Sequence, residues 1–139
     1  MYYLRTKQSF DAAHFLKNYE GKCRNIHGHR WNVVVEIASE YIQEEGANRG
    51  MVFDFGDLKA KLKQICEEFD HALICEEGAL KAKTLEALQE EEFRIVLVPF
   101  TPTAENFARY IYQKMKETFQ EVCKVAVYET PDNCAMYEE

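Results

Sequence analysis

The stretch Cys23-Arg24-Asn25-Ile26-His27-Gly28-His29 sets the interpretation of the whole chain, together with His14, which lies nine residues before Cys23. Three of the four histidines lie within sixteen residues. On an extended backbone, residues two apart point to the same face, so His27 and His29 share one. Two imidazoles on one face and a third from a neighbouring segment form the three-nitrogen set of catalytic zinc, which keeps its fourth position open. The pattern therefore predicts a zinc site.

Cys23 has two interpretations at this point. As a thiolate it could be the fourth zinc ligand, which would close the site to substrate. It could instead be a reactive thiol beside the metal. Between the two histidines, Gly28 has no side chain, and we expect it to let a metal or substrate approach the backbone closely.

Strands are predicted on both sides of this stretch. Tyr2 to Phe10 alternates and contains no glycine or proline, which predicts a strand that ends near His14. The long β-branched run from Trp31 to Ala38 predicts a second strand, which begins near Arg30. The polar residues 17–25 between them are predicted to form a loop.

Two amphipathic helices and three further strands follow. Apolar residues at helical spacing between Phe55 and Phe69 predict a helix with Asp54 near its N-cap. Thr103 is the expected N-cap of a second helix that continues to about Phe119. The remaining predictions are a loop over 76–92 with a short helix around Leu85, a strand over 94–98, and a hairpin of strands 122–128 and 134–137.

This order of elements predicts one α+β domain over residues 1–139, in which an antiparallel sheet carries two helices on one face. A chain of this length has nothing left to cover the other face. We therefore expect the protein to form oligomers.

Composition excludes several classes of protein. The chain carries a net charge of −7 and a pI near 5.2, which argues against nucleic-acid binding because that requires clustered Lys and Arg. No apolar run approaches the roughly 20 residues of a membrane span. The N-terminus lacks the apolar core of a signal peptide, and the five cysteines show no disulfide spacing, which favours reduced thiols and a cytoplasmic location.

An ordered set of motifs resembles the family of 6-pyruvoyl-tetrahydropterin and 6-carboxy-tetrahydropterin synthases over essentially the whole chain. The motifs are Ser9-Phe10-Asp11-Ala12-Ala13-His14, Cys23 with His27-Gly28-His29, Phe53-Asp54-Phe55-Gly56-Asp57-Leu58-Lys59, Phe69-Asp70-His71, Pro102-Thr103-Ala104-Glu105-Asn106 and Tyr128-Glu129-Thr130. No single motif is decisive, but their order is specific. The segment 76–98 is longer than in the shortest members of the family.

The resemblance implies the tunnelling fold (T-fold), in which subunits pair their sheets into barrels, commonly as a homohexamer made of two trimers. It implies zinc held by His14, His27 and His29, and a small pterin substrate, 7,8-dihydroneopterin triphosphate. The spacing Cys-x-x-x-His-Gly-His is similar to that of the 6-carboxy subtype of queuosine biosynthesis, which releases acetaldehyde and triphosphate. Two alternatives stay open. The protein could be an enzyme whose product is 6-pyruvoyl-tetrahydropterin, or it could be a non-catalytic binding module stabilised by zinc.

The resemblance also implies a role for each remaining site residue. Cys23 would be the catalytic base, with His71 as its acid/base partner and Asp70 as the group that assists His71. Glu129 would anchor the amino-pyrimidine edge of the pterin, because a carboxylate matches two adjacent N–H donors, and would take part in proton transfer. Thr103 and Glu105 would contact the pterin ring.

If the family resemblance is set aside, purely structural interpretations of the same residues stay open. Asp70 and His71 could be an exposed charge pair at a helix end, and Glu129 could point outward to solvent. Thr103 and Glu105 could serve only as N-cap and first-turn acid of their helix.

Overall fold

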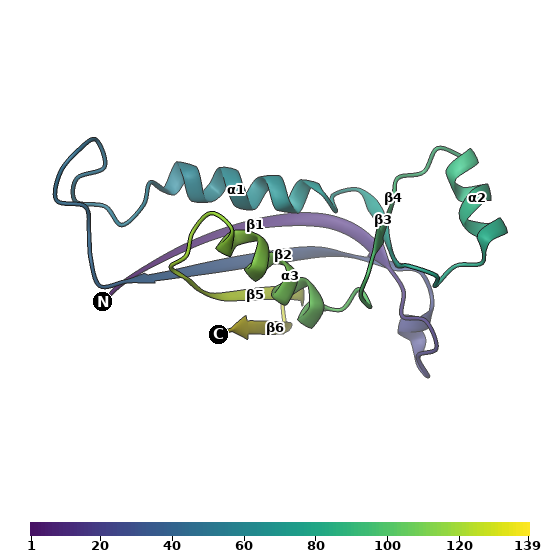
Figure 1. The fold of residues 1–139 in the computed structure, drawn as a ribbon. Coiled ribbons are helices and arrows are strands. Elements are labelled where there is room, and N and C mark those ends of the chain that lie inside the picture. The colour runs from purple at the N-terminus through teal and green to yellow at the C-terminus, as the bar shows by residue number, and fades with distance from the viewer.

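The computed structural model describes residues 1–139 as a six-stranded sheet with strand order β4-β3-β1-β2-β5-β6. Two long, arched strands, β1 (Tyr2–His14) and β2 (His27–Ser39), form its centre and run antiparallel (Figure 1). β5 (Val122–Thr130) pairs with β2, and the edge strand β6 (Asn133–Glu138) pairs with β5, both antiparallel. β3 (Ala72–Glu76) and β4 (Ile95–Val98) extend the other side.

The pairing of β3 and β4 differs from the prediction. β3 runs parallel to β1 over only three residues, Ala12 to His14, and β4 runs parallel to β3. The sheet is therefore antiparallel over four strands and parallel at one end. β3 was not predicted, because the five residues Ala-Leu-Ile-Cys-Glu form too short a run to be distinguished from the acidic segment that follows.

Three α-helices connect these strands. α1 (Phe55–Glu67) begins at the N-cap Asp54, whose carboxylate accepts a hydrogen bond from the Gly56 N–H at 2.6 Å. α3 (Ala104–Lys116) begins at Thr103 as predicted and ends three residues before Phe119. The short helix predicted around Leu85 is α2 (Ala82–Glu90), which extends from the end of the molecule that carries β3 and β4 (Figure 1). None of the three helices is both long and apolar enough to cross a membrane.

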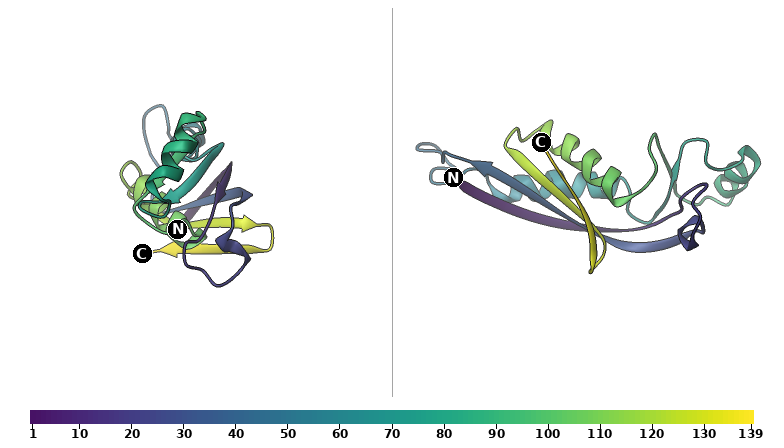
Figure 2. Two further views of the ribbon diagram at one scale, coloured as in Figure 1. Left: turned by 90° about the vertical axis from the view of Figure 1, so that its right-hand side faces the viewer. Right: turned by 90° about the horizontal axis from the view of Figure 1, so that it is seen from below.

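α1 and α3 cover one face of the sheet and enclose the core. α1 packs on β1, and α3 packs on β5 and β6 (Figures 1 and 2). The centre of this core is aromatic: the Phe10 and Trp31 rings stack at 5.9 Å, and the Phe107 ring lies 5.0 Å from Trp31. Alternation along β1 and β2 places the even residues of β1 and the odd residues of β2 on this covered face.

The other face of the sheet, called the polar face below, is mostly polar. Three cross-strand ion pairs lie on it: Arg5 with Glu36, Arg30 with Asp11, and Lys124 with Glu138. Antiparallel sheets commonly leave one face in water, but Tyr3 and Met136 are also exposed on this face. The expected oligomer stays a prediction.

Candidate metal and active site

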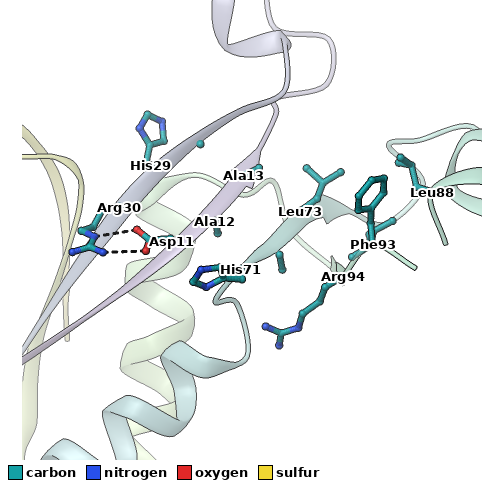
Figure 3. A pocket seen from close by; sticks show the side chains of 13 residues that line it. Asp11, Ala12, Ala13, His29, Arg30, His71, Leu73, Leu88, Phe93 and Arg94 are labelled. Carbon is teal, nitrogen blue, oxygen red and sulfur yellow. Dashed lines mark hydrogen bonds and ion pairs between the residues drawn. The ribbon is translucent and has the colours of Figure 1, made fainter. Parts of the chain in front are cut away.

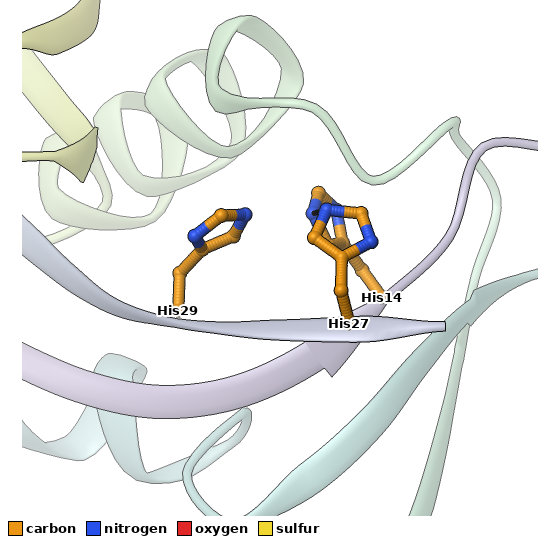
Figure 4. Close-up of side chains that lie close together, drawn as sticks. All are labelled: His14, His27 and His29. Atoms are coloured by element: carbon orange, nitrogen blue, oxygen red, sulfur yellow. Dashed lines mark hydrogen bonds between the residues drawn. The ribbon is translucent and has the colours of Figure 1, made fainter. Parts of the chain in front are cut away.

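Three histidine side chains converge at the end of the β1–β2 pair. His14 lies directly opposite His27 across the antiparallel ladder, and His29 lies opposite Ala12, two residues from His14. This register places the three side chains on the covered face of the sheet, with their ligand nitrogens all within 4.8 Å of one another (Figure 4). The prediction that these residues form one cluster is confirmed.

Hydrogen bonds fix which nitrogen each ring offers. His14 Nδ1 lies 2.6 Å from the carbonyl oxygen of Pro102, and His27 Nδ1 lies 2.7 Å from that of Asn25. A carbonyl oxygen only accepts, so both Nδ1 atoms carry the proton and both Nε2 atoms keep a free lone pair. Carbonyl partners of this kind are the usual second contact of metal-bound imidazoles.

The third ring has a buried nitrogen without a hydrogen bond. His29 Nε2 is buried and has no hydrogen-bond partner, and the nearest carboxylate oxygen, Oε1 of Glu129, is 3.4 Å away. Burial lowers the pKa of both His14 and His29 below the ordinary value of 6.5, which favours the neutral, ligating form of each ring. The cluster could therefore hold a metal ion, and three imidazoles suit zinc.

The Trp31 ring packs against His14 and His29 of the cluster. Trp31 was not predicted as part of this site. Its ring centroid lies 4.9 Å from that of His14 and 5.4 Å from that of His29, and its Nε1–H donates to the Ala12 carbonyl oxygen at 3.3 Å. It is fully buried. The alternation that pairs His27 with His29 continues to Trp31, so this position was visible in the sequence.

Gly28, in contrast, does not serve the cluster. It lies within β2 and on the opposite face of the strand from His27 and His29. Gly28 therefore does not open the backbone to a metal in the cluster, but it lines the larger pocket that also contains His71, so the approach of substrate to its backbone stays a prediction.

Cys23 lies outside the group of metal-ligating side chains. It is half-buried in a short 3-10 helix, Lys22–Arg24, and its backbone carbonyl accepts from the Leu16 N–H at 2.9 Å. That hydrogen bond closes the loop that leads from β1 to β2. Because the cluster contains the three histidines and not Cys23, a metal there would keep a position open.

Asp70 and His71 follow α1 and form a hydrogen-bonded pair. Oδ2 of Asp70 lies 2.8 Å from Nδ1 of His71, while Oδ1 accepts from the Asp11 N–H at 2.9 Å. This backbone N–H and then the imidazole lower the pKa of the Asp70 carboxyl group. The pair is thus arranged to keep Nδ1 of His71 protonated and Nε2 free.

The structure places His71 on the opposite face of the β1–β2 pair from the histidine cluster. Its side chain is 79% exposed and lies in a pocket of about 540 Å³ together with Asp11, Arg30 and Arg94, and His29 also lines this pocket, although its ring points away (Figure 3). Asp11 and Arg30 belong to the polar face, whereas His29 points away from it. One chain therefore does not bring His71 next to Cys23 and the cluster.

Glu129 points to the covered face, as predicted, with 31% of its side chain exposed. It lines a pocket of about 230 Å³ between the start of α3 and the β5–β6 turn, together with Glu105. Thr103 caps α3 by accepting from the Asn106 N–H at 3.4 Å, and Glu105 lies in the first turn. The structure brings Glu105 and Glu129 together beside the histidine cluster.

The fold and the site define an α+β protein with a cluster of three histidines that could hold a metal ion. Comparison with known proteins specifies its relationships. The family model described as 6-pyruvoyl tetrahydropterin synthase matches residues 3–139, so the chain belongs to this family of lyase-type enzymes.

Two relatives and two solved structures illustrate the match. A protein of Haemophilus influenzae named 6-carboxy-5,6,7,8-tetrahydropterin synthase is 35% identical over the full length of both chains. A protein of the same name from Synechocystis is 32% identical over 99% of this chain and 93% of its own.

The structure of Caenorhabditis elegans 6-pyruvoyl tetrahydropterin synthase superimposes with a TM-score of 0.71 at 25% identity and covers 99% of this chain and 95% of that one. An uncharacterized protein of Wolinella succinogenes, WS1659, reaches a TM-score of 0.80 at 22% identity, with 99% and 98% covered. The tunnelling fold expected for the single chain is confirmed, and the assembly of subunits into a barrel stays a prediction.

Proposed function

We propose that this protein is a zinc-dependent 6-carboxy-5,6,7,8-tetrahydropterin synthase of queuosine (7-deazapurine) biosynthesis. It would convert 7,8-dihydroneopterin triphosphate to 6-carboxy-tetrahydropterin, acetaldehyde and triphosphate. The match to the Haemophilus influenzae relative over the full length of both chains carries this proposal. The Cys-x-x-x-His-Gly-His spacing at Cys23 supports the same subtype.

The residues around the histidine cluster suit this chemistry. His14, His27 and His29 would hold zinc, which supplies Lewis-acid polarisation of substrate oxygen atoms when it is bound. Cys23 would remove a proton from the substrate side chain as a thiolate. The pterin ring would lie in the small pocket beside the cluster, where the Glu129 carboxylate would accept its two adjacent N–H groups. Thr103 and Glu105 would contact the ring from the start of α3.

His71 would act as the proton-transfer partner of Cys23, with Asp70 holding its ring. Since His71 lies on the other face of the sheet, a second chain would have to supply it. Two free strand edges support such an assembly: β1 has no partner other than β2 over residues 2–11, and β6 pairs only with β5. Unpaired edges of this kind are suited to strand pairing between copies. We propose a cytoplasmic homohexamer, a dimer of trimers.

Incubation of the purified protein with 7,8-dihydroneopterin triphosphate tests this function. We expect acetaldehyde and a carboxylated pterin, measured by coupled assay and mass spectrometry. Triphosphate release with a 6-pyruvoyl product would instead support the activity named in the Caenorhabditis elegans relative.

Cys23→Ala separates an enzyme from a zinc-stabilised binding module. The enzyme should keep its zinc and lose turnover by about 10²-fold or more, because a general base is removed. A module in which Cys23 closes the site would lose zinc and stability. Cys123→Ala is the matched control, since Cys123 is half-buried like Cys23 and lies near the far end of the β2–β5 pair from the histidine cluster.

A further inference from the structure

Arg94, the residue before β4, connects three parts of the chain. Its Nη2 group donates to the carbonyl oxygens of Glu67 at 3.0 Å and Glu68 at 2.9 Å, and its Nη1 group donates to the carbonyl oxygen of Asp70. Its own carbonyl oxygen accepts from the Leu73 N–H at 3.0 Å. In Figure 3 its side chain extends past His71 toward the turn that follows α1.

The C-terminal end of α1 carries negative charge without a basic side chain of its own to offset it. Its last turn contains no basic side chain, while Glu67, Glu68 and Asp70 add carboxylates near the negative end of the helix dipole. A guanidinium group offers several N–H donors in a fixed fork and carries a positive charge. Arg94 therefore satisfies the carbonyl groups at this helix end and offsets its charge.

The same contacts fix the backbone of His71. This residue has a φ of 54°, a left-handed conformation that side chains with a Cβ adopt at a cost and keep only where their surroundings impose it. The peptide unit between Asp70 and His71 is held at both ends, because Arg94 donates to its carbonyl oxygen and its N–H donates to the Asp11 carbonyl oxygen at 2.7 Å. The direction of the His71 side chain follows from the orientation of this peptide.

We propose that Arg94 is a positioning residue for His71. By holding the Asp70 carbonyl oxygen, it keeps the His71 ring in hydrogen-bond contact with the Asp70 carboxylate. The catalytic consequence rests on the proposed function, in which His71 transfers a proton. The positional consequence does not depend on any activity.

The positional consequence can be read from the nitrogen-15 NMR signals of the His71 ring, assigned with His71→Ala. In the native protein, at a pH where the ring is neutral, we expect one tautomer with the proton on Nδ1, because that nitrogen faces Asp70. Arg94→Ala should give a mixture of both tautomers, and Arg94→Lys an intermediate spectrum, since an ammonium group cannot reproduce the fork. Arg49→Ala, in the exposed loop before α1, should leave the signals unchanged. Unchanged His71 signals in folded Arg94→Ala or Arg94→Lys would overturn the proposal.

The catalytic consequence is tested by a double-mutant cycle with acetaldehyde release as the readout. Arg94→Ala should lower kcat by about tenfold to a hundredfold, as expected when a reacting group is misplaced, with zinc content retained. In the His71→Ala background the same change should alter kcat by less than about twofold, because Arg94 acts through His71. An equal loss in both backgrounds would contradict the proposal and assign Arg94 a general structural role. If the native protein releases no product, the proposed function fails, and the His71 spectra still decide whether Arg94 positions the ring.

Discussion

The Nε2 atoms of His14 and His27 lie 3.1 Å apart. Each ring donates its Nδ1 proton to a backbone carbonyl group, so the two nitrogens that face each other both carry lone pairs. Such a pair repels unless a cation lies between them. Two nitrogens bound to one tetrahedral zinc ion at its usual distance are separated by about 3.3 Å. The chain thus holds the two imidazoles at the separation that a metal ion requires.

The first prediction concerns this metal. His27→Ala should lower the zinc content from about one ion per chain to near zero, because two imidazoles do not form a catalytic zinc site. Zinc is measured by mass spectrometry of the purified protein after dialysis. His71→Ala is the matched control: it removes the one histidine outside the cluster and should leave the zinc content unchanged. Equal zinc loss in both variants would mean that the metal binds elsewhere.

The second prediction concerns stability in acid. The pKa of Asp70 is lowered from 3.8 in the folded chain, first by the Asp11 N–H and then by His71. The ionised form therefore stabilises the fold at pH values above 3.8, and this contribution is lost as the pH falls through the lower, folded pKa. Urea denaturation between pH 5 and pH 2.5 should show a smaller loss of stability in Asp70→Asn than in the native protein. Glu86→Gln, on exposed α2, should follow the native curve; parallel curves for Asp70→Asn and the native protein would refute the role assigned to these hydrogen bonds.

The third prediction concerns Glu129. Glu129→Gln keeps the shape of the side chain and removes its charge, so it should raise KM for the pterin substrate by about tenfold to a hundredfold, the usual value of hydrogen bonds to a charged group. Zinc content should not change, because the three histidines remain. Glu138→Gln is a suitable control, since Glu138 pairs with Lys124 on the polar face. An unchanged KM for Glu129→Gln would mean that a residue other than Glu129 binds the pterin ring.

The metal cluster was predictable from the sequence for a simple reason. His27 and His29 are two residues apart on a strand, so their shared face follows from local geometry. The contribution of His14 followed from an antiparallel partner strand that ends nearby. The capping roles of Asp54 and Thr103 were equally local, and the structure confirms both.

Features that depend on the packing of distant segments could not be predicted in this way. The parallel pairing of β3 with β1 involves three residues and has no sequence signature. The position of His71 on the polar face follows from its left-handed backbone and from the Asp11 and Arg94 contacts, none of which the sequence reveals. The family resemblance assigned His71 and Cys23 to one catalytic site, and the fold separates them within one chain.

The last prediction uses this separation. If a working site combines Cys23 of one chain with His71 of another, Cys23→Ala and His71→Ala should each release acetaldehyde only at a low residual rate. Activity should rise when the two variants are mixed under conditions that exchange subunits. In an equal mixture each chain is drawn at random from the two variants, so about a quarter of the sites pair an intact Cys23 with an intact His71. Acetaldehyde release should therefore recover to about a quarter of the native rate. A mixture of Cys23→Ala with the double variant Cys23→Ala/His71→Ala contains no intact Cys23 and should stay at the low residual rate. No recovery in the first mixture, with subunit exchange confirmed by native mass spectrometry, would mean that His71 of a second chain does not complete the site.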